Sequence, residues 1–446
     1  MRNKVKKELF YAVRSLLRDN PLSRQVLARL RSHALLDQQG MALLQLKLLH
    51  ASLQRAIKVL PYYAHIDSKF SVDETLQVLQ REFPIIDKQV LLANRQTLYP
   101  NGGKAKPWFS IGKTSGTTGT PLSVFRSPMS VLYEMAFVKR HWEWNGFVAG
   151  MRSAVLRGDM VVPQAQSAPP FWFYNRHDRQ LLISSRHLKE QYMAAICDRL
   201  EAYAPAMLQA YPSTAFTLAS YLQRQQRYLS IPLVFTSSEP LYAHQRLLIE
   251  ERFNARVSDM YGMAERVAFV TACERGSMHV NADYSHVEIV DEQGQPTTDY
   301  GYVVGTTLNN LAMPLVRYRL SDRTRWKAGH CACGRPFAML EEITGKYEDA
   351  IYGSDGQPVS PSVLTFAFKG IDHIIKSQVA QVGEGRWQIR VVPAPGFSEV
   401  QRSALIDNIR NFVDSDIIVE ITLTSDIPNT SAAKFRWVVN EHEKNN

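Results

Sequence analysis

The chain has 446 residues, of which 45% are hydrophobic and 21% charged, which is typical of globular proteins with room for two or three domains. No apolar run reaches the roughly 18 residues that a membrane span needs, and the first residues do not resemble a signal peptide, so we expect a cytoplasmic protein. The formal net charge of +10 suits anionic ligands such as nucleotides and coenzymes, or a lipid surface. No nucleic-acid-binding motif is found, and we expect no nucleic acid partner.

The segment from Met1 to Asn20 predicts a basic amphipathic helix, because lysines and arginines alternate with apolar residues. Two interpretations stay open: its apolar stripe lies on an anionic membrane periphery, or it packs on its own domain. A second helix is predicted from Ala42 to Leu60 and ends at Pro61. We interpret residues 1–100 as a helical scaffold.

A loop rich in glycine and hydroxyl groups follows this scaffold: Thr114-Ser115-Gly116-Thr117-Thr118-Gly119-Thr120-Pro121. Two glycines let the backbone curl, and the hydroxyl and N–H groups can converge on phosphate oxygens. The loop is not a P-loop, since no lysine follows the second glycine. The pattern therefore predicts a phosphate-binding loop of another kind, with a surface turn of small residues as the alternative.

Helical and β-rich segments alternate between Trp108 and about Thr344, which predicts a mixed α/β layer architecture over residues 101–345. Residues 346–446 form a smaller predicted unit of α+β type, which we interpret as a lid. The predicted helices are Ser127 to Trp144, His187 to Tyr203 and Ser398 to Val413; the predicted strands are Leu233 to Thr236, Arg256 to Met260, His286 to Val290, Tyr302 to Leu308, Ile374 to Val382, Trp387 to Val392 and Ile417 to Leu423.

Short polar motifs stand at the ends of these segments, where α/β sheets collect ligands. Each motif is weak by itself, and their order along the chain is the stronger signal. They are Ser237-Ser238-Glu239-Pro240, Tyr261-Gly262-Met263-Ala264-Glu265, Pro314-Leu315-Val316-Arg317-Tyr318-Arg319-Leu320-Ser321-Asp322, Gly345-Lys346-Tyr347-Glu348-Asp349 and Ile427-Pro428-Asn429-Thr430-Ser431-Ala432-Ala433-Lys434.

This ordered set resembles the adenylate-forming superfamily of acyl-CoA synthetases, and within it the phenylacetate-CoA ligases and CapK-like proteins of capsular polysaccharide biosynthesis. Leu60-Pro61-Tyr62-Tyr63, Phe83-Pro84-Ile85-Ile86-Asp87-Lys88 and Tyr211-Pro212-Ser213 resemble signatures of that branch. The resemblance implies a large mixed α/β N-terminal body with a small mobile α+β C-terminal domain. It also implies that ATP and a small carboxylic acid give acyl-AMP and pyrophosphate, after which coenzyme A or an amine displaces AMP.

The resemblance also implies a role for each motif around the nucleotide. The loop from Thr114 to Gly119 (Thr114, Ser115, Gly116, Thr117, Thr118 and Gly119) would hold the departing phosphates. Glu265 would ligate Mg²⁺, with a capping or surface acid as the alternative. Ser238 and Glu239 would line the adenine pocket, and Tyr261 would flank the base.

Further roles fall later in the chain. Asp322 would accept hydrogen bonds from the ribose hydroxyls, with a turn-forming aspartate as the alternative. Lys434 would be the catalytic lysine that the C-terminal domain brings to the carboxylate and α-phosphate, the alternative being an ordinary exposed lysine. Lys346 would contact the nucleotide and Glu348 would be the hinge. The sequence departs from the family pattern in four places: Ser321 and Ala433 stand for glycine, Lys346 for arginine, and Glu348 for aspartate or lysine.

Three of the four cysteines, with one histidine, have the residue types of a structural zinc site. Cys331 and Cys333 form a compact knuckle, and Cys273 and His279 stand on a hairpin-like turn upstream. Three thiolates and one imidazole fill a tetrahedral coordination shell, so a catalytic zinc is not expected. Ordinary reduced thiols are the alternative. Cys197 lies on a predicted amphipathic helix and is interpreted as a buried apolar residue.

The acyl pocket has no clear signature. The aromatic run from Phe171 to Tyr174 suits either an acyl pocket wall or the core, and Arg157 suits either an anionic ligand or the surface. Two function classes therefore stay open. The first is an adenylate-forming ligase, monomer or dimer, acting on CoA or an amine acceptor. The second is a nucleotide-binding partner protein of a polysaccharide assembly pathway that has lost adenylation.

Overall fold

The computed structural model describes residues 2–113, 122–239, 241, 243–343, 351–356, 358–359, 364, 367–368, 371, 373–393, 396–427 and 438–442. These residues form two compact units. Unit 1 comprises residues 2–113, 122–150 and 258–343, and unit 2 comprises residues 151–257 and 351–442. The division into residues 1–100, 101–345 and 346–446 stays a prediction.

The helices α2, α3, α5 and α7 of unit 1 begin at capping residues that the sequence supplies. Asn20 and Ser23 exchange side-chain and backbone hydrogen bonds in a capping box, and Asp37 accepts from the Gly40 N–H at 2.7 Å. The predicted helix from Ala42 is confirmed and begins earlier because of this cap. The helices are α1 (Arg2–Arg18), α2 (Pro21–His33), α3 (Gln38–Val59), α4 (Thr75–Glu82), α5 (Lys88–Ala93), α6 (Arg95–Leu98) and α7 (Pro128–Trp144), with short 3₁₀ turns at Pro61–Tyr63 and Pro100–Gly103.

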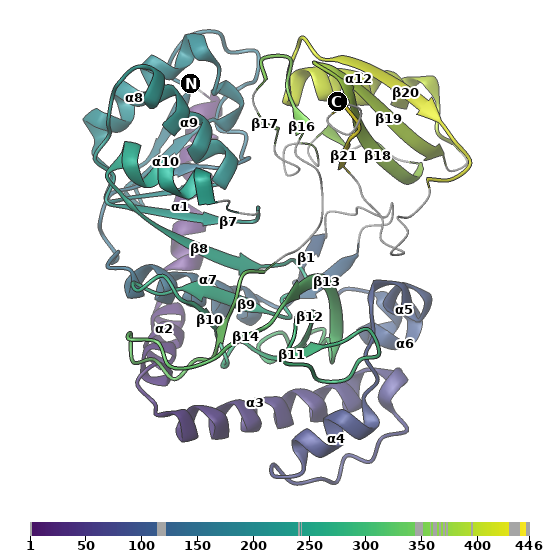
Figure 1. The fold of residues 1–446 in the computed structure, drawn as a ribbon. Helices are drawn as coiled ribbons and strands as arrows, with labels where there is room; N and C mark the ends of the chain where they lie inside the picture. The colour runs from purple at the N-terminus through teal and green to yellow at the C-terminus, as the bar shows by residue number, and fades with distance from the viewer. Residues whose placement is uncertain are drawn as a thin grey trace. The chain divides into compact units, whose positions relative to one another are not determined.

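The described strands of unit 1 form three antiparallel groups (Figure 1). Gly305 lets the backbone at Val267 approach its strand closely, because a Cβ at residue 305 would lie 2.0 Å from the Val267 carbonyl oxygen. Their shared core contains fully buried Leu49, Leu53 and Val303. The groups are the hairpin of β1 (Ser110–Lys113) and β2 (Ser123–Arg126); the sheet β11 (Ser285–Val290), β12 (Gly301–Thr307), β13 (Tyr318–Thr324); and the row β14 (Trp326–Lys327), β15 (Met339–Leu340), β10 (Met278–Val280), β9 (Phe269–Ala272), β8 (Arg256–Gly262).

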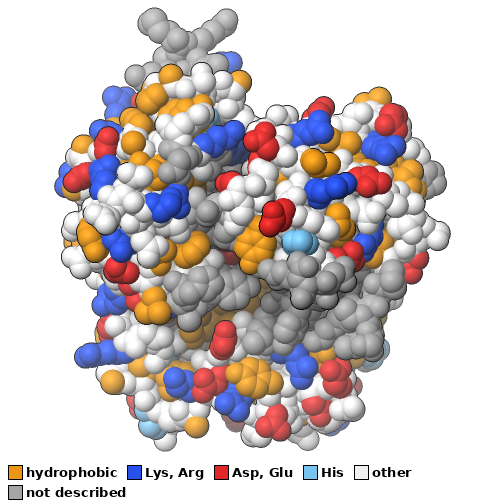
Figure 2. Space-filling model, turned by 45° about the horizontal axis from the view of Figure 1, so that its top comes forward, with side chains coloured by type: hydrophobic (Ala, Val, Ile, Leu, Met, Phe, Trp, Pro, Cys, Tyr) orange, Lys and Arg blue, Asp and Glu red, His pale blue; other side chains and the backbone are white. Residues whose placement is uncertain are grey.

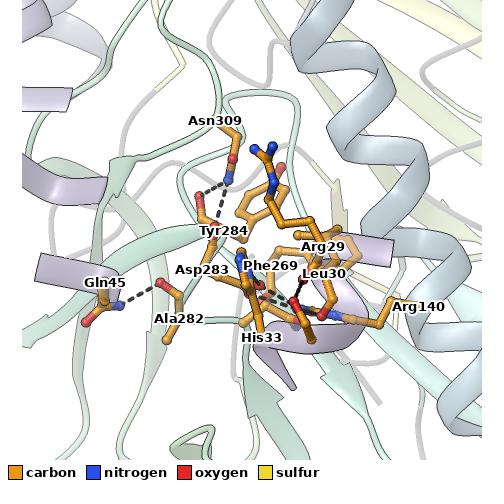
Figure 3. A network of polar contacts seen from close by, with 12 residues as sticks. Arg29, Leu30, His33, Gln45, Arg140, Phe269, Ala282, Asp283, Tyr284 and Asn309 are labelled. Carbon is orange, nitrogen blue, oxygen red and sulfur yellow. Dashed lines mark hydrogen bonds and ion pairs between the residues drawn. The ribbon is translucent and has the colours of Figure 1, made fainter. Parts of the chain in front are cut away.

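A buried ionic network joins α2 and α7 to the segment after β10 (Figure 3). Arg140 is 1% exposed and donates to both carboxylate oxygens of Asp283, at 2.7 and 2.8 Å. It also donates to the Leu30 carbonyl at 2.9 Å and to the Asn281 side chain at 2.7 Å. His33 lies 2.9 Å from the same carboxylate. The network stabilises the attachment of α2 to the rest of unit 1.

Unit 2 contains a second row of strands with helices packed beside it (Figure 1). β7, β6, β3 and β5 run parallel in this order, and β4 closes the row as an antiparallel edge. Side chains of the helices and strands share one core, with Leu208, Leu222 and Phe253 fully buried. The elements are β3 (Ser153–Leu156), β4 (Trp172–Asn175), β5 (Gln180–Ile183), α8 (Glu190–Tyr203), β6 (Met207–Ala210), α9 (Pro212–Arg224), β7 (Leu233–Ser237) and α10 (Ala243–Phe253), with a 3₁₀ turn at Ser185–His187.

The C-terminal part of unit 2 contains a four-stranded sheet with helix α12 packed on it. The strand order is β20 (Ile418–Leu423), β19 (Arg386–Pro393), β18 (Ile374–Gly383), β21 (Val438–Asn440), and α12 (Glu399–Phe412) packs on it through Leu405 and Ile409. A short hairpin pairs β16 (Ile351–Tyr352) with β17 (Pro358–Val359). The predicted mixed α/β fold class with a small α+β C-terminal part is confirmed.

Charged side chains of both signs are interspersed over the face of the molecule drawn in Figure 2, so the net positive charge is not gathered there into one basic patch. Among the described residues, no helix combines the length and the apolar character that crossing a bilayer requires.

Candidate functional site

The β1–β2 hairpin frames the predicted phosphate loop. Lys113 pairs with Ser123 at the end of the hairpin, so residues 114–122 connect the two strands. The site residues predicted within this connection, Thr114, Ser115, Gly116, Thr117, Thr118 and Gly119, lie outside the described residues. The structure describes the β1–β2 hairpin, which fixes the positions of the two residues where this connection begins and ends.

Arg126, at the end of β2, is a candidate site residue that sequence reasoning missed. Its guanidinium donates at 2.7 Å to the carbonyl of Ala264, the residue directly before Glu265. Burial lowers the pKa of Arg126 and neighbouring Arg266 lowers it further, while Glu265 is among the acids that act in the opposite direction. The sequence feature that could have pointed to Arg126 is Gly112 on the paired strand. A Cβ at residue 112 would lie 2.2 Å from the guanidinium carbon of Arg126. A partly buried cation therefore stands beside the predicted magnesium ligand.

Tyr261 and Asp322, predicted to contact base and ribose, are brought together. The Tyr261 phenol, at the end of β8, donates at 2.8 Å to Asp322 Oδ2, in the middle of β13. Burial raises the pKa of Tyr261 well above its ordinary value, and the charges of Asp322 and Glu265 raise it further. The phenol therefore stays protonated at neutral pH and holds the Asp322 carboxylate in a fixed orientation. Glu265 is partly buried and belongs to the same electrostatic neighbourhood.

In unit 2, the carboxyl ends of β3, β6 and β7 carry a second polar cluster. Arg157 follows β3 and donates to the hydroxyls of Ser237 and Ser238, at 3.0 and 2.9 Å. Its guanidinium also lies over the ring of Tyr211, 4.9 Å from the centroid, directly after β6. Ser238 has a φ of 73°, a left-handed conformation that costs backbone energy in a residue other than glycine. Glu239 follows it and is partly buried.

Three further predicted site residues lie outside the described residues. Lys346 and Glu348 belong to the segment 344–350, and Lys434 belongs to 428–437. Their predicted roles at the nucleotide, the hinge and the reacting carboxylate remain hypotheses.

The aromatic run is divided between core and surface. Phe171 is fully buried and stacks on His187 with ring centroids 4.8 Å apart, so it belongs to the core of unit 2. Tyr174, on the edge strand β4, is 41% exposed. The geometry does not gather the four rings into one pocket wall.

The four predicted zinc ligands come together in unit 1. Cys273 follows β9, His279 lies on β10, and Cys331 and Cys333 stand between β14 and β15. Their ligand atoms all lie within 4.8 Å of one another. His279 Nδ1 is 2.9 Å from the Phe337 carbonyl oxygen, which fixes Nδ1 as the protonated nitrogen and leaves Nε2 to face Cys333 at 3.3 Å. Cys197 is fully buried in the apolar core of unit 2, as predicted.

The spacing within this cluster fits a tetrahedral ion. Two sulfurs bound at about 2.3 Å to a tetrahedral zinc stand about 3.8 Å apart, and a sulfur and an imidazole nitrogen about 3.6 Å. The Sγ atoms of Cys273 and Cys331 are 3.7 Å apart, too far for a disulfide. Burial opposes ionisation of Cys331, but hydrogen bonds from Ser277 and other neighbours lower its pKa to about 6, whereas burial raises the pKa of Cys273 and of Cys333. The residues present therefore fit a metal ion.

The chain is similar to several known proteins. A family model, the CapK C-terminal domain, matches residues 351–441. CapK of Staphylococcus aureus is 26% identical over 60% of this chain and 60% of CapK. Phenylacetate-coenzyme A ligases of Thermus thermophilus and Pseudomonas putida are each 26% identical, over 47% and 69% of this chain and 50% and 71% of the ligases. The chain thus spans 60% and 50% of the length of the first two relatives.

Solved structures share the fold. A 2-hydroxyisobutyryl-CoA ligase in complex with 2-HIB-AMP and CoA aligns with a TM-score of 0.57 at 19% identity, over 90% of this chain and 90% of that chain. An open conformation of the same ligase aligns with a TM-score of 0.52 at 19% identity, over 89% and 91%. The chain is therefore similar in sequence to CapK and to the phenylacetate-coenzyme A ligases, and it shares the fold of 2-hydroxyisobutyryl-CoA ligase.

Proposed function

We propose that this protein is an adenylate-forming ligase, which activates a small carboxylic acid with ATP as acyl-AMP and transfers the acyl group to coenzyme A or an amine. The observation that carries the proposal is the contact of Tyr261 with Asp322 in the electrostatic neighbourhood of Glu265. An acid oriented by a neutral phenol suits a vicinal diol, and a nearby second acid suits the cation that accompanies ATP. Homology to phenylacetate-coenzyme A ligases supports the same reaction.

The binding roles follow from the chemistry of each group. Asp322 would accept hydrogen bonds from the ribose hydroxyls, and Ser238, Glu239 and Tyr261 would surround the adenine. Arg157 donates to the Ser238 hydroxyl and would orient this side chain, so we assign it as a positioning residue. Lys346 would also contact the nucleotide.

The reacting groups carry charge. A carboxylate oxygen attacks the α-phosphorus, the bond to the bridging oxygen breaks, and pyrophosphate leaves. Ser115 and the rest of the loop through Gly119 would stabilise the departing phosphates. Glu265, a hard oxygen ligand, would hold Mg²⁺, which neutralises polyphosphate charge when bound. Lys434 would offset the repulsion between the two anions as they approach, and Glu348 would act as the hinge that brings it there.

Similarity to CapK supports a narrower proposal, in which the acyl group is destined for surface polysaccharide. The match of residues 351–441 to the CapK C-terminal domain and the 26% identity to CapK are its basis. On this proposal the acceptor is the amine of a sugar or amino acid, and on the ligase-like alternative it is the thiol of coenzyme A.

Exchange of labelled pyrophosphate into ATP tests the reaction. With a panel of aromatic, short-chain and hydroxy acids, we expect at least one acid to support exchange, because formation of acyl-AMP is reversible before transfer. A folded protein that binds ATP but supports exchange with no acid would contradict the proposal and favour the nucleotide-binding partner protein. Adding coenzyme A or amines to the active acid then identifies the acceptor by the product that forms.

We also propose that Cys273, His279, Cys331 and Cys333 bind one structural zinc ion. The ion would tie the β9–β10 hairpin to the segment between β14 and β15, with all four positions filled by protein. We expect about one equivalent of zinc in the purified protein by elemental analysis. Cys333→Ser should lower the zinc content and the melting temperature, whereas Cys197→Ser should leave the zinc content unchanged. Less than about half an equivalent in the unmodified protein would contradict the site.

A further inference from the structure

Helix α1 turns a stripe of large apolar side chains toward solvent. Leu9, Phe10, Val13, Leu16 and Leu17 are 65%, 59%, 48%, 71% and 65% exposed. They follow the spacing i, i+1, i+4, i+7, i+8, so they occupy one face of the helix. Tyr11 is 7% exposed and lies on the opposite face of the helix, so that face is the covered one. The stripe is therefore not the face that attaches α1 to the protein.

Basic residues border this stripe. Lys7, Arg14 and Arg18 are seven and four positions apart and fall along one edge of it, and exposed Lys6 lies beside Phe10 on the stripe itself. The whole helix contains six basic residues and one acid, Glu8, a net charge of +5. An apolar stripe with a cationic border matches the interface of a bilayer with anionic headgroups, whose negative surface potential attracts basic segments.

Charge also distinguishes between two candidate partners of this stripe, a second copy of this chain and a lipid surface. A second copy of this chain would bring two helices of net charge +5 together, which like-charge repulsion disfavours. An anionic lipid surface would attract the same charges. At 17 residues α1 is long enough to lie in the membrane plane, and none of the described helices suits a span.

We propose that α1 is a membrane-surface anchor, which binds anionic bilayers by inserting Leu9, Phe10, Val13, Leu16 and Leu17 at the headgroup level. This inference is independent of the proposed ligase activity. It places the protein at the surface of an anionic membrane.

Sedimentation of the full-length protein with lipid vesicles tests the anchor. We expect a partition coefficient at least about tenfold higher for vesicles of phosphatidylcholine and phosphatidylglycerol than for phosphatidylcholine alone, decreasing as salt rises. Leu16→Ser with Leu17→Ser should lower binding at least about tenfold. The matched control, Leu247→Ser with Val400→Ser, changes side chains that are 67% and 77% exposed elsewhere and should bind as the unmodified protein does.

Three results would overturn the anchor. One is equal binding by the stripe variant and the unmodified protein, and another is the absence of any preference for anionic vesicles. The third is a dimer, detected by light scattering, that the stripe variant dissociates while no vesicle binding occurs. If the stripe variant fails to fold, Lys6→Glu with Arg14→Glu, which leaves the apolar residues intact, should still remove the preference for anionic vesicles.

Discussion

Replacing Lys434 with alanine is expected to lower the rate of acyl-AMP formation by about 10²–10³-fold, the usual effect of removing one positioned donor from a developing charge. Attack of a carboxylate on a phosphate ester brings two anions together, so a lysine at the reacting atoms acts mainly in the transition state. ATP affinity should change little, because on the proposed function the loop, Glu265 and Asp322 would provide the ground-state binding of ATP. Single-turnover formation of acyl-AMP and equilibrium binding of ATP measure the two effects separately.

The control for this prediction is Lys69→Ala, an exposed lysine of unit 1 outside every motif, which should retain full activity. Equal loss of ATP affinity and of adenylation in the Lys434 variant would contradict the assigned role, since it would make Lys434 a binding residue. An unchanged rate would make it an ordinary surface lysine.

Replacing Asp283 with alanine is expected to destabilise the protein by about 3–5 kcal/mol, because it leaves the Arg140 guanidinium charged and buried without its partner. Chemical denaturation monitored by circular dichroism measures the free energy of unfolding. The matched control is Asp19→Ala, which breaks the exposed ion pair with Arg24 and should cost roughly 0.2–1 kcal/mol.

The contribution of Asp283 also has a pH dependence of known sign. Burial raises the pKa of this carboxyl, but Arg140 and His33 outweigh burial and hold the pKa below its ordinary value. A group whose pKa is lowered by folding stabilises the native state above its unfolded pKa of about 3.9 and loses that contribution as pH falls through the folded value. The difference between the unmodified protein and Asp283→Ala should therefore shrink below about pH 4. A difference that grows toward acid pH would contradict this interpretation.

Local patterns predicted much of the fold because the elements have strong periodicity and clear ends. The strand from Leu233, the helix from Ser398 and the helix ending at Pro61 are all present in the structure within a few residues. The cysteine and histidine cluster was predictable because coordination chemistry restricts which residue types can share an ion.

Other features depend on contacts between distant segments, which no local pattern encodes. Arg126 reaches the backbone at Ala264 across 138 residues, and Arg140 reaches Asp283 across 143. Arg157 contacts Ser238 because three parallel strands end at one edge, and its neighbours in sequence give no sign of it. For α1, the amphipathic pattern was evident from the sequence, but which face of the helix the protein covers depends on tertiary packing. The structure leaves the apolar stripe exposed.

The most direct test of acyl-adenylate formation follows one oxygen atom. With a substrate acid labelled with ¹⁸O in its carboxylate, attack on the α-phosphorus transfers one labelled oxygen to AMP, and mass spectrometry of the released nucleotide should show AMP heavier by that single atom. Release of ADP with the label in inorganic phosphate would mean attack on the γ-phosphorus and an acyl phosphate intermediate, and would contradict the account.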